Sequence, residues 1–357
     1  MRVVTVIGNR PQFVKASAVS HRLRAVGEEL LVHTGQHYDD ELSNLFVREL
    51  DVPPPERELG LGGGSNTEQT TAMLAELGSL LDRERPDAVL VYGDTNSTLA
   101  GGLAAAQAGL PVVHVEAGMR SFDRAMPEEV NRVLTDHLAS LLLCSSDDAA
   151  RQLEREGVGG DVMIVGDVMI DVALAIQPRA RQRVDVLERL GVASGEFLLV
   201  TAHRAGNVDD PERLSALVEL LVELPHPVVL PLHPRTRERL ERYRLFDRLA
   251  GADRVELLAP VGYLEFTALL CHARAVLTDS GGIQKEAYLA GVPCLTLRDR
   301  TEWGETVQAG WNTLVDLDRE ATLAALAASP PPERPPLYGD GHAGARVVEA
   351  LRRLVGG

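Results

Sequence analysis

The sequence predicts an α/β protein with two Rossmann-like, doubly wound domains, and three observations carry this prediction. Short, continuously apolar runs recur along the chain, and longer amphipathic segments separate them. Continuous rather than alternating apolar runs are typical of parallel strands that helices cover on both faces. The runs form two sets, one in each half, and a chain of 357 residues exceeds one ordinary hydrophobic core.

The first half contains a series of candidate strands, each ending at small or polar residues. In chain order they are RVVTVIG (2–8), LLVHTG (30–35), AVLVYGD (88–94), VVHVEAG (112–118), LLLCSS (141–146) and VMIVGD (162–167). Between the second and third of these, the segment TEQTTAMLAELGSLLDRERPD (67–87) has the apolar spacing of a helix. This alternation of strand and helix indicates a parallel sheet.

The second half repeats the pattern. Its candidate strands are FLLVTAH (197–203), PVVLPLH (227–233), RVELLAP (254–260), AVLTDSGG (275–282) and PCLTLR (293–298), and DPERLSALVELLVEL (210–224) predicts a helix between the first two. We expect the domain break near Gly166–Pro178, with an N-terminal domain over 1–168 and a C-terminal domain over 169–341. The Pro-rich stretch SPPPERPP (329–336) then leads to a last helix over 342–357.

Composition disfavours several classes of protein. No apolar run reaches the roughly 18 residues that a membrane span needs, and no basic and apolar leader precedes the first strand. The net charge of -16 disfavours nucleic acid as a partner. Cys144, Cys271 and Cys294 lie far apart in or beside apolar runs, as expected of reduced core residues in a cytoplasmic protein.

Ligands of open parallel sheets bind beyond the carboxyl ends of the strands, so the residues at those ends are the first candidates for a site. Carboxylates, Asp94 and Glu116, follow strands of the first half. The groups suited to anions mostly follow strands of the second half. This asymmetry predicts acid/base chemistry in the first domain and anion binding in the second.

The segment LTDSGGIQKEA (277–287) predicts a strand, a Ser-Gly-Gly turn and a helix start. Gly281 and Gly282 allow a ligand close to the backbone, helix N–H groups face an anion there, and Ser280 can add a hydroxyl donor. Glu286 lies one helical turn after Gly282, where it could accept hydrogen bonds from sugar hydroxyls. The competing interpretation is an N-capped helix with a surface glutamate.

Positive charge for a phosphate could come from the first domain as well. Arg10 and Lys15 follow the first strand. For Lys15 taken alone, a solvated helix residue is the competing interpretation.

Four residues are candidates for proton transfer. Asp94 ends a strand where a helix begins, so the competing interpretation is a helix N-cap. Glu116 is expected to be partly buried, because it follows an apolar run and precedes Ala117-Gly118. Glu128 or its neighbour Glu129 could serve, although acids are favoured at a helix start by the dipole alone. A strand-end histidine, His203, could transfer a proton or bind a leaving phosphate, with a structural role as the competing interpretation.

The sequence predicts no metal site. Asp94, Glu116, Glu128 and His203 are suitable ligand types, but none belongs to a paired local spacing. The pair His33 and His37 crosses a strand end and a glycine turn, so no helix aligns both rings.

Taken together, these motifs resemble the non-hydrolysing UDP-N-acetylglucosamine 2-epimerases. The matching strings follow the order and spacing of the family over nearly the whole chain: GNRPQFVK (8–15), TGQHYDD (34–40), YGDTNST (92–98), HVEAGMRS (114–121), MPEEVNR (126–132), HRAGN (203–207), HPRT (233–236), LTDSGGIQKEA (277–287) and TLRDRTEW (296–303). The resemblance implies a glycosyltransferase-B type fold with the active site in the inter-domain cleft and the last helix packed on the first domain. It also implies interconversion of UDP-GlcNAc and UDP-ManNAc by elimination and re-addition of UDP, without metal or redox cofactor.

The resemblance assigns roles by motif position. Asp94, Glu116 and Glu128 become the carboxylates around C2 of the sugar, which leaves Glu129 as a plain helix-start acid, and His203 supports departure of UDP. The implied substrate-binding residues are Arg10, Lys15, Arg132, Phe266, Ser280, Gly281, Gly282, Glu286 and Arg298, with Phe266 stacking on uracil. Gln36, Gln69 and His233 could form a second, activating UDP-GlcNAc site.

The strings also depart from the common bacterial pattern. Asn9 replaces a threonine, Gly206 replaces an acid, and TEWGET and GQHYDD look more like archaeal members and like epimerases of UDP-2,3-diacetamido-2,3-dideoxy-glucuronate. The physiological UDP-sugar is therefore open between these two. The motifs also allow a glycosyltransferase of the same fold, a hydrolysing epimerase that releases free ManNAc, or a non-catalytic UDP-sugar sensor. The family implies a homodimer.

Overall fold

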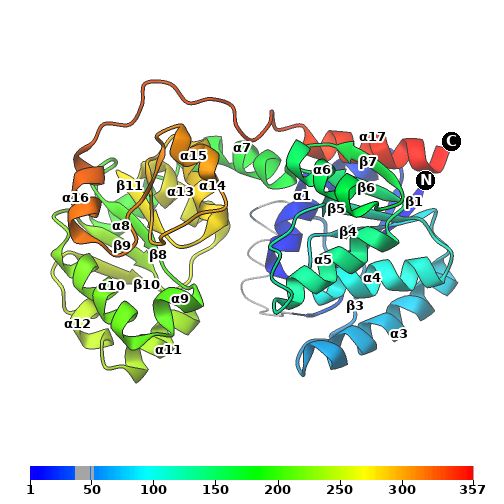
Figure 1. Ribbon diagram of the computed structural model, residues 1–357, viewed down its shortest axis with the longest axis horizontal. Coiled ribbons are helices and arrows are strands. Elements are labelled where there is room, and N and C mark those ends of the chain that lie inside the picture. The colour runs from blue at the N-terminus through cyan, green and yellow to red at the C-terminus, as the bar shows by residue number, and fades with distance from the viewer. Residues whose placement is uncertain (37–48, 50–51, 357) are drawn as a thin grey trace. The chain divides into compact units, whose positions relative to one another are not determined.

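The computed structural model describes residues 1–36, 49 and 52–356. The chain divides into two compact units (Figure 1). The first unit comprises Met1–Val172 and Tyr338–Gly357, and the second comprises Ala173–Leu337. Helix α7 (Val168–Arg181) runs across the division.

The first unit is built on a wholly parallel sheet whose seven strands, within the described residues, have the order β3-β2-β1-β4-β5-β6-β7. The strands are β1 (Arg2–Ile7), β2 (Glu28–His33), β3 (Arg57–Glu58), β4 (Ala88–Tyr92), β5 (Val112–Ala117), β6 (Leu141–Cys144) and β7 (Asp161–Ile164). The helices are α1 (Arg10–Arg24), α3 (Asn66–Glu84), α4 (Asn96–Gln107), α5 (Pro127–Leu138), α6 (Asp147–Glu156) and α17 (Ala343–Gly356). The strand order reverses between β1 and β4, where a doubly wound sheet places its site.

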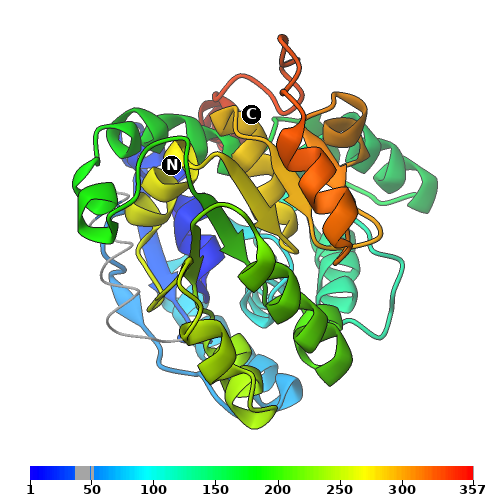
Figure 2. The same cartoon turned by 90° about the vertical axis from the view of Figure 1, so that its left-hand side faces the viewer.

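The second unit has the same plan, with six parallel strands in the described residues in the order β10-β9-β8-β11-β12-β13 (Figure 2). The strands are β8 (Leu198–Thr201), β9 (Val228–Pro231), β10 (Val255–Leu258), β11 (Ala275–Thr278), β12 (Cys294–Thr296) and β13 (Asn312–Leu314). The helices are α8 (Asp185–Leu190), α9 (Ala205–Val208), α10 (Pro211–Glu223), α11 (Pro234–Arg242), α12 (Phe246–Ala250), α13 (Tyr263–His272), α14 (Gly281–Ala290), α15 (Gly304–Gln308) and α16 (Arg319–Ala327). Here the order reverses between β8 and β11.

The apolar runs of the sequence form the cores of these units. Every residue of β4, β8 and β11 is buried, as expected of central strands that helices cover on both faces. The predicted fold class, two Rossmann-like α/β units, is confirmed. The short edge strands β3 and β13 were not predicted, because two or three residues show no periodicity to detect.

The last helix belongs to the first unit. The carboxylate of Asp171 accepts hydrogen bonds from the backbone N–H groups of Ala343 (3.0 Å) and Gly344 (2.8 Å) at the start of α17. These bonds satisfy N–H groups that a helix start leaves without partners. No helix in the described part of the chain is long and apolar enough to span a lipid bilayer.

Candidate active site

The turn after β4 brings a glycine, a lysine and two carboxylates together. Gly93 has φ +64°, and a Cβ placed on it would lie 3.1 Å from Lys15 Nζ and 3.5 Å from Glu116 Oε2. A side chain at this position would therefore be both strained and crowded. The next residue, Asp94, forms an ion pair with Arg132 of α5, and its backbone carbonyl accepts a hydrogen bond from Asn131 Nδ2 at 3.0 Å.

Asp94 is not the N-cap of α4, so that interpretation of the sequence is wrong. The cap is Thr95, whose Oγ1 accepts a hydrogen bond from the backbone N–H of Thr98 at 3.2 Å. A hydroxyl at the cap position leaves the neighbouring carboxylate outside the helix. Asp94 is one-third exposed and therefore accessible to a ligand.

Glu116 stands in an uncommon backbone conformation near the end of β5. Its φ is +73°, and the pairing with β6 shifts register between Val115 and Ala117, so Glu116 forms a bulge. A left-handed conformation of a non-glycine residue costs about 1–3 kcal/mol and persists only where the surroundings hold it. The expected partial burial of Glu116 is confirmed, since 19% of its side chain is exposed.

Lys15 of α1 pairs with Glu116 and is only 13% exposed, so it is not the solvated helix residue that its position alone suggested. Burial acts to lower the pKa of Lys15, but attraction to Glu116, with Asp94 and Asp167, outweighs burial and raises it. Lys15 is therefore a cation at neutral pH. Arg10, the first residue of α1, has a side chain that lies outside the described residues.

The two glutamates at the start of α5 have different environments. Glu128 is exposed. Glu129 is buried, and its carboxylate accepts hydrogen bonds from the backbone N–H groups of Ser121 (2.8 Å) and Phe122 (3.0 Å) and from Arg132. Burial opposes the charge of Glu129, but these hydrogen bonds outweigh it and lower its pKa.

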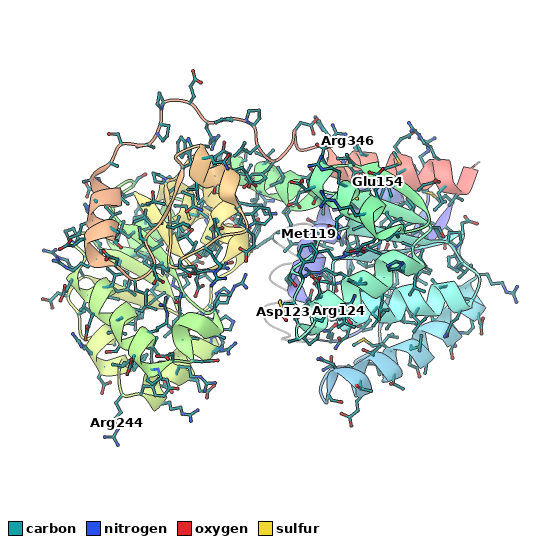
Figure 3. All side chains as sticks on the ribbon, viewed as in Figure 1. Met119, Asp123, Arg124, Glu154, Arg244 and Arg346 are labelled. Carbon is teal, nitrogen blue, oxygen red and sulfur yellow. The ribbon has the colours of Figure 1, made fainter. Side chains whose placement is uncertain are left out.

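The expectation that Glu129 is a plain helix-start acid is therefore wrong. It closes the loop between β5 and α5, in which Figure 3 labels Met119, Asp123 and Arg124. Because Arg132 bonds both Glu129 and Asp94, that loop and the turn after β4 share one guanidinium.

Gln36 and Gln69 bind the first turn of α4. Gln36 Oε1 accepts hydrogen bonds from the backbone N–H (3.0 Å) and the hydroxyl (2.7 Å) of Ser97. Gln69 Oε1 accepts one from Asn96 Nδ2 at 3.1 Å, and Asn96 Oδ1 accepts another from Asn131. Both glutamines are thus linked through α4 to the Asp94 turn. Residues 37–40 of the TGQHYDD string lie outside the described residues.

In the second unit, Asp279 organises the segment after β8. This fully buried carboxylate accepts hydrogen bonds from the backbone N–H groups of His203 (3.0 Å) and Arg204 (2.9 Å) and from Asn207 Nδ2 (3.2 Å). Nothing in the neighbouring sequence indicates this role of Asp279, because its partners lie more than 70 positions away in the chain.

His203 is held next to Asp279 and is partly exposed. Its Nδ1 lies 3.8 Å from Asp279 Oδ1, and its ring stacks on His233 with centroids 5.3 Å apart. Burial, together with Arg204 and Arg235, lowers the pKa of His203 despite the attraction of Asp279. His233 also caps α11, since its Nδ1 accepts a hydrogen bond from the backbone N–H of Arg235 at 3.2 Å.

The Ser-Gly-Gly turn begins α14, as predicted. Ser280 is the N-cap residue, but its side chain makes no capping hydrogen bond. A Cβ placed on Gly281 would lie 2.8 Å from Trp303 Nε1, whereas a Cβ placed on Gly282 would have no neighbour within 4 Å. Gly281 is thus needed for packing, and Gly282 presents open backbone at the helix start.

The remaining predicted residues of this unit already have partners. Burial raises the pKa of Glu286 to about 7, although a hydrogen bond from the hydroxyl of Tyr263 (3.2 Å) acts to lower it. Arg298 makes a two-pronged ion pair with Glu302, at 3.0 and 2.9 Å. Phe266 on α13 packs against apolar core residues.

The described residues contain no group of three or more metal-ligating side chains arranged to hold an ion. What the geometry offers is a pair of carboxylates, each next to a cation, in the first unit. The second unit offers a helix start, a histidine and a partly protonated glutamate. These groups can move protons and bind an anionic, hydroxyl-bearing ligand.

Comparison with known proteins gives consistent matches. The family model for UDP-N-acetylglucosamine 2-epimerase matches residues 21–352. A UDP-N-acetylglucosamine 2-epimerase homolog of Methanococcus maripaludis is 45% identical, covering 99% of this chain and 100% of that protein. The UDP-2,3-diacetamido-2,3-dideoxy-D-glucuronate 2-epimerase of Pseudomonas aeruginosa is 44% identical over the same shares.

A solved structure is also similar over the full length. The UDP-GlcNAc 2-epimerase of Methanocaldococcus jannaschii, in complex with UDP-GlcNAc and UDP, has a TM-score of 0.86 to this chain and is 40% identical. The match covers 99% of this chain and 100% of that one.

Proposed function

This chain belongs to the UDP-N-acetylglucosamine 2-epimerase family, and we propose that it is an isomerase interconverting UDP-GlcNAc and UDP-ManNAc. The observation that carries the proposal is the position of Glu116, which leaves the β5 ladder in a bulge next to Lys15 and the Gly93–Asp94 turn. A carboxylate held this way can take a weakly acidic proton, such as the one on C2 of the sugar.

The reaction proceeds in two halves. In the first, a carboxylate removes the C2 proton, the C–H electron pair becomes the C1=C2 double bond, and the C1–O bond to UDP breaks. UDP leaves as an anion, with 2-acetamidoglucal as the other product. In the second half, UDP oxygen re-forms the bond to C1 and C2 takes a proton on its opposite face. Asp94, Glu116 and Glu128 are the candidate acids and bases, and their positions leave open which one removes the proton.

We assign the second unit to the nucleotide. Gly282 and Ser280 offer donors at the start of α14 for the pyrophosphate, and Glu286 offers a carboxylate for the ribose hydroxyls. His203 can stabilise the departing UDP, since the Asp279 carboxylate fixes the backbone beside it. Arg10, Phe266 and Arg298 complete this assignment on the strength of their motifs.

Lys15 and Arg132 have a double role in this proposal. Each is a cation that the family motifs assign to the substrate, and each is paired with a carboxylate, Glu116 or Asp94. An anionic substrate that attracts either cation therefore weakens its pairing and frees the carboxylate for the sugar. Substrate binding and activation of the base are thus coupled.

The 44% identical relative from Pseudomonas aeruginosa supports a second candidate substrate, UDP-2,3-diacetamido-2,3-dideoxy-glucuronate. Its identity to this chain is practically the same as that of the Methanococcus maripaludis relative, so sequence similarity does not choose between the two UDP-sugars.

Incubation of the protein with each UDP-sugar in deuterated water, without an acceptor, tests the proposal. We expect UDP-ManNAc from UDP-GlcNAc, with deuterium at C2, and no product from the Glu116→Gln variant, which still binds UDP. Turnover without deuterium contradicts the elimination route. Free ManNAc indicates a hydrolysing enzyme, and turnover only with an added acceptor indicates a glycosyltransferase.

Three further predictions concern activation, assembly and location. The candidates for an activating site remain Gln36, Gln69 and His233. An activating site would be revealed if UDP-GlcNAc accelerated the conversion of UDP-ManNAc to UDP-GlcNAc. A homodimer is expected from the family. Light scattering during gel filtration measures the mass in solution, and the mass of a single chain would contradict this expectation. A cytoplasmic location stays a prediction from the sequence.

A further inference from the structure

A buried charge network lies directly behind the bulge at Glu116, and the proposed reaction gives it no role. Its members are His114 on β5, Asp136 on α5, Arg120 in the loop between them, and Glu156 at the end of α6. The side chains of His114 and Asp136 are completely buried, and that of Arg120 is 2% exposed. Burying this many charges is costly unless every one is paired.

Asp136 binds the chain on both sides of Glu116. Its Oδ1 lies 2.7 Å from Nδ1 of His114, two residues before Glu116, and its Oδ2 accepts the backbone N–H of Gly118, two residues after, at 3.2 Å. Arg120 donates to the same Oδ2 at 2.7 Å. A single carboxylate therefore closes the bulge that holds Glu116 in its left-handed conformation.

His114 extends the network to the other strand of the site. Its Nε2 lies 2.7 Å from the carbonyl oxygen of Gly93, and the backbone N–H of Gly93 donates to the carbonyl of Val115 at 3.0 Å. Gly93 is thus bound to β5 through both of its backbone polar groups. Because Asp94 follows Gly93 directly, the His114 ring sets where Asp94 lies relative to Glu116.

The hydrogen bonds also place a proton on the ring of His114. A carbonyl oxygen only accepts, so Nε2 of His114 carries a hydrogen. Asp136 also accepts bonds from Arg120 and Gly118, so Nδ1 of His114 lies next to a second acceptor group. Arg120 in turn pairs with both Asp136 and Glu156.

We propose that His114 and Asp136 are positioning residues of the epimerisation, which hold the Glu116 bulge and the Gly93–Asp94 turn in one fixed geometry. The inference rests on the proposed function, since it assigns the two residues to the placement of its catalytic carboxylates. Neither residue touches the substrate. Their effect on the rate is indirect and acts through Glu116 and Asp94.

The test compares His114→Ala, Asp136→Ala and Asp136→Asn with Glu29→Gln as a matched control. Glu29 is also a buried carboxylate of the first unit, bonded by Thr5, Ser20 and Arg24, but it lies at the start of β2. For His114→Ala and Asp136→Ala we expect kcat to fall about 100-fold, because a displacement of about 1 Å costs that much. KM and the Kd for UDP should change little.

Asp136→Asn is the conservative variant. Its amide oxygen can accept from Gly118 and Arg120 while its NH2 group donates to Nδ1 of His114, which leaves the Nε2–H bond to Gly93 in place. We therefore expect kcat within about tenfold of wild type. Glu29→Gln should keep the wild-type kcat, even if it is less stable to urea.

Several outcomes would overturn the inference. One is a wild-type kcat in His114→Ala. Another is a loss of kcat in Asp136→Asn as large as the loss in Asp136→Ala. A third is a loss of kcat in Glu29→Gln as large as the loss in the alanine variants. If the alanine variants do not fold, a loss in kcat of more than about tenfold in Asp136→Asn still contradicts the inference. A spectrum that needs no turnover then tests the hydrogen bonds. Long-range ¹H–¹⁵N correlation should show a hydrogen on Nε2 of His114 in the wild type and in Asp136→Asn; a wild-type Nε2 without a hydrogen contradicts the network. A wild-type protein that epimerises neither UDP-sugar overturns the proposed function instead, while the spectrum still tests the hydrogen bonds.

Discussion

The ammonium group of Lys15, on the first helix, is in contact with the carboxylate of Glu116, which leaves the ladder of β5. Both side chains are largely shielded from water, so the attraction between their charges is less screened by solvent than in a surface salt bridge. It ties the proposed base to a cation that the family motifs assign to the substrate. In the enzyme without substrate, the charge of Lys15 thus balances the negative charge of Glu116, a proposed base.

A double-mutant cycle measures this pair. Lys15→Met and Glu116→Gln should each lower the free energy of unfolding, because each leaves a mostly buried partner without its bond. The double variant should lose less than the sum, with a coupling of about 1–3 kcal/mol. Strictly additive losses in urea unfolding would show that the two side chains do not interact.

The same pair predicts a loss of stability at alkaline pH. Since the folded state raises the pKa of Lys15 above its ordinary 10.5, the pair contributes fully below about pH 10.5 and is lost as pH rises through the raised value. We expect wild type to lose more unfolding free energy than Lys15→Met above that pH. Parallel curves for the two proteins would contradict this.

Gly93→Ala should lower kcat in addition to lowering the stability of the fold. An alanine would meet Lys15 Nζ at 3.1 Å, in addition to the left-handed strain of about 1–2 kcal/mol. Gly109→Ala is the matched control, because Gly109 has φ +70° but no neighbour within 4 Å of a built Cβ. Both variants should lose similar stability, and Gly93→Ala should also lose roughly 10–100-fold in kcat; an equal kcat in both would show that crowding at Lys15 is harmless.

Gly282→Ala should weaken the binding of UDP without destabilising the fold. The new methyl group meets nothing in the protein and lies at the start of a helix, so the unfolding free energy should stay level or rise by up to about 1 kcal/mol. The methyl would occupy space next to the proposed pyrophosphate, and UDP affinity should fall about tenfold or more. Calorimetry with UDP measures this, with Gly78→Ala in α3 as the helix control that should bind UDP normally.

Glu286 should make UDP binding depend on pH. With a pKa of about 7, it is half protonated at neutral pH, and its ionised form is the better acceptor for two ribose hydroxyls. UDP affinity should therefore rise about tenfold between pH 6 and 8, beyond the change in Glu286→Gln. Taking that difference removes the ionisation of UDP itself, and identical pH curves would exclude Glu286 from the ribose site.

The raised pKa of Glu286 also makes the free energy of unfolding depend on pH. Between the ordinary value of 4.5 and about pH 7, the folded protein holds a proton that the unfolded chain has released. Unfolding free energy should therefore fall as pH rises through this window and level off above it, with a flatter curve in Glu286→Gln.

Substitution of the two adjacent glutamates at the start of α5 should have different effects, on kcat for Glu128 and on stability for Glu129. Glu128→Gln changes an exposed side chain, so stability should be unchanged while kcat falls about 100-fold or more if Glu128 transfers a proton. Glu129→Gln weakens the hydrogen bonds to Ser121, Phe122 and Arg132 and should cost about 1–3 kcal/mol in stability. A wild-type kcat in Glu128→Gln would remove it from the proposed acids and bases.

The fold could be predicted because it depends on a repeated local signal. Apolar strands such as β4 and the helices between them are visible in any short window of sequence. The positions of Asp94, Glu116 and the Ser-Gly-Gly turn followed from the rule that sites lie at strand ends. Their surroundings did not follow.

What the sequence could not supply are pairings between distant residues. Nothing local distinguishes Glu128 from Glu129, since the difference comes from a loop that folds back on Glu129 alone. The left-handed conformation of Glu116 leaves no trace in VVHVEAG, and Asp136, which bonds the chain on both sides of Glu116, lies in the next helix. Asp279 is likewise a strand-end acid in the sequence, and only the fold brings it under His203.

The return of the chain to its first unit has a consequence for synthesis. Because Asp171 caps α17, the first unit needs residues that are synthesised after the whole of the second unit. The second unit is contiguous, so during translation it can finish folding while the unit that begins the chain is still incomplete. The unit that carries Asp94 and Glu116 is therefore completed only after the second unit has been synthesised.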